Sequence, residues 1–163
     1  MARRPPTIPR QHLKDGVVSC LSVVQSRLQE AGVLVEGGYL AQAFVLFSLA
    51  VEEFGKAVLL REAYETRGDP VMIEGFYDHD RKLDAAAKHV PERFLLVHTE
   101  PVPFSPLLRV GSPIDLNTRL SALYVDWKDG GWRVGTPVDS EFLEENMGML
   151  EAIVLEMKID WTD

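Results

Sequence analysis

The amino-acid sequence predicts a mainly α-helical protein: an up-and-down four-helix bundle with a proline-rich loop and a small β-hairpin before the last helix. Two observations support this fold class. Apolar residues recur at helical spacing through most of the chain. Residues 122–134 differ, because they combine β-branched and aromatic residues with a turn signal. With 163 residues, we expect one helical domain at 10–163 after a flexible leader at 1–9.

The first three helices are predicted from their apolar positions and their ends. Residues 10–32 have an apolar residue every three or four positions, and Gly32 marks the predicted end. A second apolar stripe begins after Gly37–Gly38 and continues to about Thr66, which predicts a helix of about eight turns. A less regular pattern over residues 71–89 predicts a third helix.

The later part of the chain changes character twice. Residues 99–118 contain four prolines and predict a long irregular loop. Residues 122–134 contain the turn sequence Lys128-Asp129-Gly130-Gly131 between two segments of β-branched and aromatic residues, and this pattern predicts a two-stranded hairpin. Asp139 and Ser140 then supply N-cap chemistry for a last helix with its own apolar stripe.

Composition limits the class of protein. A net charge of −8, from 25 acidic and 17 basic residues, disfavours binding that depends on wholesale neutralisation of nucleic-acid phosphates, although it allows a local basic groove. The single cysteine, Cys20, cannot form an internal disulfide and is expected to be a buried thiol. The leader lacks the apolar core of a signal peptide, and no apolar run is long enough to span a membrane. We therefore expect a cytoplasmic protein.

The segment AVEEFGKAVLL, residues 50–60, places charges within an otherwise apolar helix. Glu52 and Lys56 are four residues apart and therefore neighbours on the helix, and Glu53 lies beside them. One explanation is an intrahelical ion pair at the edge of the core. The other is a polar site inside a helical bundle.

Two further segments extend this motif: HDRKL at 79–83 and RLSALYVDWKDGGW at 119–132. In this order and approximate spacing, the three segments resemble the AbiV family of bacterial abortive-infection proteins, which is grouped with the HEPN-like helical domains. The resemblance covers about residues 35–140. It implies phage defence linked to arrest of translation. It assigns the polar residues of the family to Glu52, Glu53, Lys56, His79, Lys82, Arg119, Tyr124 and Asp126.

Many HEPN relatives cut RNA at a dimer interface, so the resemblance raises the question of metal-independent ribonuclease activity. Their signature is an arginine and a histidine with four to six residues between them, which supply a cation for the phosphate and a base for the 2′-hydroxyl. Arg93 and His98 have this spacing, although about one such match is expected by chance. The catalytic set that we predict is His79, Lys82 and Arg119, which offers an imidazole and two cations, with Arg93 and His98 as the alternative pair.

No metal and no cofactor are expected. The Glu-x-x-His pairs of a di-iron bundle are absent from the sequence, and one cysteine with four scattered histidines does not form a zinc pattern. No glycine-rich loop follows a predicted strand, so a nucleotide site is not indicated either.

Two functions are therefore predicted. In the first, the polar cluster lines a groove of a homodimeric defence protein that acts on RNA or a ribosome-associated target, with a phage protein as a candidate activator. Glu52 and Glu53 then orient the cationic residues and the histidine. In the second, the protein is a non-catalytic module that binds a phage or host protein, and the same residues form a structural network. The first function requires a cationic cleft, and the second requires paired, buried charges.

Overall fold

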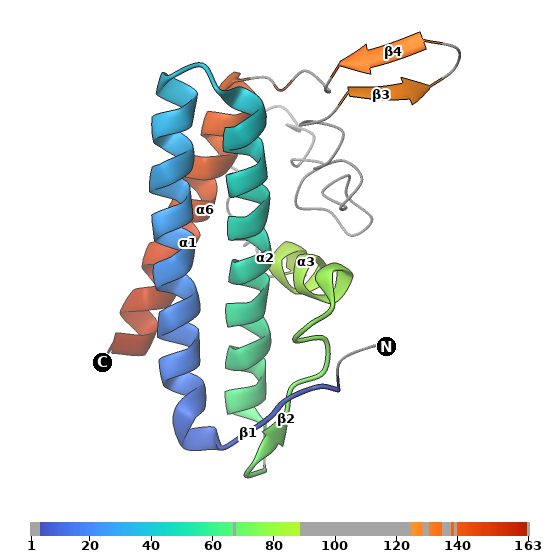
Figure 1. Cartoon of the computed structure of the whole chain (residues 1–163). Coiled ribbons are helices and arrows are strands. Elements are labelled where there is room, and N and C mark those ends of the chain that lie inside the picture. The colour runs from blue at the N-terminus through green and yellow to red at the C-terminus, as the bar shows by residue number, and fades with distance from the viewer. Residues whose placement is uncertain are drawn as a thin grey trace.

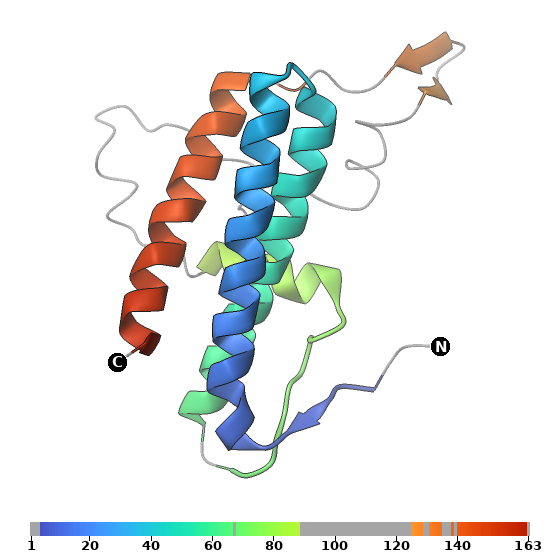
Figure 2. The ribbon, with the colours of Figure 1, turned by 60° about the vertical axis from the view of Figure 1, so that its left-hand side comes forward.

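A computed structural model describes residues 4–66, 68–88, 125–128, 131–134, 138 and 140–162. Three long helices run side by side: α1 (Leu13–Glu36), α2 (Leu40–Glu65) and α6 (Ser140–Thr162). Figure 2 shows α1 between α2 and α6. The shorter α3 (His79–Lys88) lies across α2 rather than alongside it (Figure 1). The prediction of a mainly helical fold with four packed helices is confirmed.

The turn between α1 and α2 explains why α1 is longer than predicted. Gly32 does not end the helix, since an isolated glycine is tolerated within a strong helical pattern. The helix instead continues to Glu36, and Gly38 adopts a φ of +78°, a conformation that glycine adopts without steric cost. The backbone amide of Tyr39 donates to the carbonyl of Leu34 at 2.8 Å and closes the turn.

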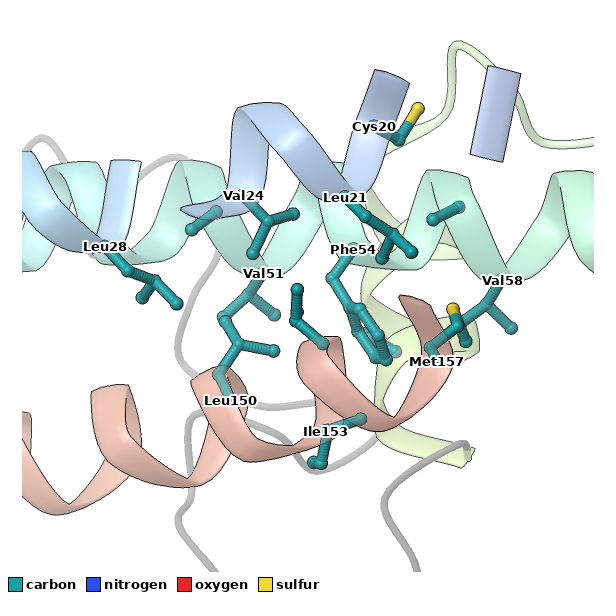
Figure 3. Packing of buried hydrophobic residues seen from close by; sticks show 14 of the residues in the cluster. Cys20, Leu21, Val24, Leu28, Val51, Phe54, Val58, Leu150, Ile153 and Met157 are labelled. Atoms are coloured by element: carbon teal, nitrogen blue, oxygen red, sulfur yellow. The ribbon is translucent and has the colours of Figure 1, made fainter. Parts of the chain in front are cut away.

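The hydrophobic core lies between the three long helices. Apolar residues at helical spacing on α1, α2 and α6 face one another, and Phe47 and Phe54 of α2 are among the largest fully buried side chains. Figure 3 shows part of this packing, with Phe54 and Val51 of α2 lying between side chains of α1 and α6. Each helix has one apolar stripe toward this core, as the sequence pattern predicted.

The segment between α2 and α3 contains structure that the sequence did not predict. A strand, β2 (Val71–Met72), pairs antiparallel with β1 (Thr7–Ile8), which lies within the expected leader. The amide of Ile73 also donates to the carbonyl of Pro6 at 3.0 Å. A short 3-10 helix, η1 (Arg10–His12), then leads into α1.

The third helix begins at His79 and not near residue 71. Gly75 has a φ of +79° in the turn after β2, and this conformation interrupts any helix. Asp78 then caps α3, since its Oδ1 accepts a hydrogen bond from the amide of Arg81 at 3.2 Å. The first part of the range predicted to be helical, residues 71–78, therefore contains β2, the turn at Gly75 and the N-cap residue Asp78.

The predicted hairpin is confirmed. It consists of β3 (Val125–Lys128) and β4 (Gly131–Val134), which pair antiparallel with Trp127 opposite Trp132. The predicted proline-rich loop at 99–118 lies outside the described residues. Of the helices in the part of the chain that the structure describes, none is long and apolar enough to cross a membrane.

Candidate functional site

The candidate site begins with Glu52, a carboxylate within the apolar part of α2. The residue is only 4% exposed, so its charge requires compensation from neighbouring groups. Gly55 lies three residues later and therefore on the same side of the helix. These two positions decide how α3 is placed.

Gly55 is where α3 approaches α2 most closely. A Cβ atom at this position would lie 1.8 Å from the backbone carbonyl oxygen of Lys82 and 2.6 Å from its carbonyl carbon. No side chain fits in that space, so glycine is needed for the two backbones to come this close. The contact places the first turn of α3 over Glu52.

Two side chains of α3 converge on one oxygen of Glu52. The Nζ atom of Lys82 donates to Oε2 at 3.0 Å, and Nδ1 of His79 lies 2.6 Å from the same atom. His79 and Lys82 are three residues apart, so they share a face of α3. This arrangement confirms that the EE-x-GK segment and the HDRK segment meet in space.

The side chains of Glu52, Lys82 and His79 differ in their exposure to solvent. The side chains of Glu52 and Lys82 are 6% and 9% exposed, whereas that of His79 is 64% exposed. The Glu52–Lys82 pair is therefore a buried ion pair, and the imidazole covers its solvent side. Of the three, His79 is the group that a dissolved target can reach.

The hydrogen bond to Glu52 determines the chemistry that His79 can perform. A carboxylate accepts hydrogen bonds, so Nδ1 of His79 carries the hydrogen and Nε2 is the acceptor of the neutral ring. Lys82 donates to the same oxygen of Glu52, so the imidazole shares this acceptor with an ammonium group. A carboxylate that orients an imidazole in this way is typical of groups that take and return a proton.

Glu53 and Lys56 form a separate pair on α2. Nζ of Lys56 donates to both carboxylate oxygens of Glu53, at 2.8 and 2.6 Å, and lies 5.4 Å from the centre of the Phe76 ring. The intrahelical ion pair therefore uses Glu53, while Glu52 pairs with α3. Both side chains of this pair are about one-fifth exposed, at 21% and 23%.

Cys20 of α1 adjoins the Glu53–Lys56 pair. The pKa of the Cys20 thiol is raised from 9.0 to about 12, first by burial and then by the charge of Glu53 and a hydrogen bond to it, with a smaller opposing effect from Lys56. The thiol is therefore protonated at neutral pH. Its burial confirms the expectation from the sequence.

Most of the remaining predicted residues belong to the part of the chain that the structure does not describe. Arg93, His98, Arg119 and Tyr124 lie outside the described residues. Asp126 lies on β3, where its register partner is Arg133. Among the residues that the structure describes, no group of three or more histidine, cysteine, aspartate or glutamate side chains could hold a metal ion.

Sequence reasoning did not recognise the roles of Gly55 and Asp78. The spacing of Gly55 from Glu52 was visible in the motif, but the nearness of another backbone has no signature in a single sequence. Asp78 could have been recognised, since an aspartate directly before a charged helical segment is typical of an N-cap.

A comparison with known protein families identifies the family of this chain. The model of the family HEPN_AbiV, described as AbiV, matches residues 12–154. The chain belongs to the AbiV family of HEPN domains. The match extends from the start of α1 into the second half of α6, so it includes all of α1, α2 and α3 and the cluster described above. No curated protein and no solved structure matches the chain.

Membership of this family is consistent with a role in abortive-infection defence against phage.

Proposed function

We propose that this AbiV protein defends the cell by acting on RNA of the translation machinery, with His79 as the residue that contacts the target. The hydrogen bond from exposed His79 to buried Glu52 carries the proposal, because it orients an imidazole toward solvent. Family membership supports the role in defence. We further propose that the protein works in the cytoplasm as a homodimer, with a phage protein as its activator.

The proposed reaction is cleavage of RNA without a metal. Nε2 of His79 takes the proton of a 2′-hydroxyl, and the 2′-oxygen attacks the adjacent phosphorus. The bond from phosphorus to the 5′-oxygen breaks, and that oxygen takes a proton from solvent water while the imidazolium returns its proton to solvent, which leaves a 2′,3′-cyclic phosphate and a 5′-hydroxyl. Lys82 is buried and bonded to Glu52, so it is a positioning residue in this scheme. Arg119 is the proposed cation for the phosphate.

The test combines a cleavage assay with a plaque assay. Wild-type protein, His79→Ala and the control His12→Ala are incubated with total RNA and with ribosomes. His12 is an exposed histidine on η1, far along the chain from the site. We expect His79→Ala to lower cleavage by about 10²-fold or more and to abolish protection from phage, because the general base is lost.

The same variants also test the alternatives. His79 is largely exposed, so we expect the Tm of His79→Ala to fall by no more than about 4 °C. Equal cleavage by His79→Ala and wild type would disprove the assignment of His79. Loss of cleavage in His98→Ala alone would assign the reaction to the Arg93–His98 pair instead.

A second candidate function is binding of a phage or host protein without catalysis. It is favoured by one observation: the two pairs Glu52–Lys82 and Glu53–Lys56 join opposite charges within the protein. Such pairs do not form a cationic groove. This function predicts that wild type leaves RNA intact, and that His79→Ala still protects cells from phage.

A further inference from the structure

An exposed aromatic side chain stands next to the candidate site. Tyr77, in the turn that precedes α3, is 45% exposed. Its ring meets that of Phe76 edge to face, with the ring centres 5.0 Å apart. Phe76 in turn packs against the core and lies under the Lys56 ammonium group. The Tyr77 ring is therefore partly exposed, and its contact with Phe76 supports its position.

The backbone brings Tyr77 close to His79. The two residues are separated only by Asp78, so their Cα atoms are no more than about 7.6 Å apart. The turn is also defined on both sides, by the positive φ of Gly75 and by the hydrogen bond from Arg81 to Asp78. Tyr77 and His79 therefore lie on one short, defined stretch of backbone.

The charges around this turn disfavour recognition through phosphate groups. Glu74, Asp78 and Asp80 are exposed, against one exposed base, Arg81. The whole chain carries a net charge of −8. A nucleic acid that binds here gains little from neutralised phosphates. Stacking of a base on an aromatic ring does not depend on charge and suits every base.

We propose that Tyr77 is a stacking platform for one unpaired RNA base, which places the 2′-hydroxyl of that nucleotide at His79. This inference rests on the proposed function and names its substrate class: single-stranded RNA or unpaired loops. Duplex RNA is excluded, because its bases are stacked on one another and cannot lie on the tyrosine ring.

The test measures binding separately from cleavage. A fluorescent single-stranded RNA with 2′-O-methyl groups cannot be cleaved, and its Kd is measured by anisotropy for wild type and variants. We expect Tyr77→Ala to raise the Kd about tenfold and Tyr77→Phe to leave it within about twofold, because phenylalanine also stacks. Tyr39→Ala is the matched control, since Tyr39 is 60% exposed on the turn between α1 and α2. Its Kd should equal that of wild type.

Two further measurements sharpen the test. The same strand annealed to its complement should bind at least about tenfold more weakly than the single strand. The Kd should change little with salt concentration, in contrast to binding that releases many counterions. A Tyr77→Ala protein with wild-type Kd, equal binding of duplex, or a steep salt dependence overturns the inference.

The outcomes also separate this inference from the proposed function. Binding that depends on Tyr77 without any cleavage of natural RNA supports the platform and contradicts the ribonuclease. Cleavage by wild type that Tyr77→Ala retains, with unchanged KM, supports the ribonuclease and overturns the platform. Loss of phage protection in Tyr77→Ala, with no RNA bound by wild type, also overturns it and points to a protein partner on this turn.

Discussion

Replacing Gly55 with alanine tests whether the close contact of α2 and α3 holds the site together. The new Cβ would lie 1.8 Å from the carbonyl oxygen of Lys82. An ordinary carbon–oxygen contact is about 3.3 Å, so α3 must retreat by roughly 1.5 Å at this point. The contact between His79 and Glu52, now 2.6 Å, would then open to roughly 4 Å, which is beyond hydrogen-bond range.

The energetic effect can be compared with a matched control. Forcing extra volume into a packed contact costs about 1–3 kcal/mol, and stretching the buried Glu52–Lys82 pair adds to this. The higher helix propensity of alanine offsets up to about 1 kcal/mol of this destabilisation. We expect a net loss of about 2 kcal/mol, or a fall in Tm of about 4–8 °C. Gly148→Ala in α6 should instead stabilise the protein, because alanine has the higher helix propensity and the added Cβ meets no neighbouring group within 4 Å.

Thermal unfolding and NMR of the His79 ring measure the two effects. Wild type should show the ring with its hydrogen on Nδ1, and Gly55→Ala should lose this preference. The reasoning is refuted if Gly55→Ala melts at or above the wild-type Tm and keeps the wild-type nitrogen shifts of His79. Gly148→Ala should keep those shifts whatever its Tm.

Three further predictions concern stability. Lys82→Met should destabilise by about 3 kcal/mol in urea unfolding, because the buried Glu52 loses the ammonium group of Lys82. Adding Glu52→Gln should restore part of the loss, and no recovery would contradict the buried pair. Wild type should lose stability relative to Cys20→Ala between pH 9 and 12, since the unfolded thiol ionises while the folded one stays protonated. The slope difference, at most about 1.4 kcal/mol per pH unit, is measured by urea midpoints, and parallel curves would contradict the raised pKa. Asp78→Ala should cost about 1 kcal/mol and speed amide exchange in α3, and unchanged exchange would argue against a cap.

The helices and the hairpin were predictable because their signals are local. The apolar stripe of α2 and its glycine start are visible within the helix itself, and the β3–β4 turn carries its own signature. The β1–β2 pair was not predictable. Its strands have two residues each and come from segments more than sixty positions apart, so neither has a periodic pattern.

The candidate site was predictable in membership but not in geometry. The family pattern named Glu52, His79 and Lys82 together, and the structure brings them onto one oxygen atom. Sequence spacing alone favoured Glu52 with Lys56, because residues four apart are neighbours on a helix. The alternative, Glu53 with Lys56, has a spacing that is just as compatible with a helix, so only the rotation of α2 toward α3 could decide between them.

The β1–β2 pair and the site both belong to the part of the chain before residue 89. Glu52 and Lys82 are thirty residues apart, whereas α6 must close a much longer segment before it can dock on α1. Short loops close at a lower entropic cost than long ones. We therefore expect α1, α2 and α3 to associate early during synthesis, with His79 already hydrogen-bonded to Glu52. We expect α6 to complete the core afterwards. A chain assembled in this order would hold His79, the proposed reactive group, in place before the whole protein reaches full stability.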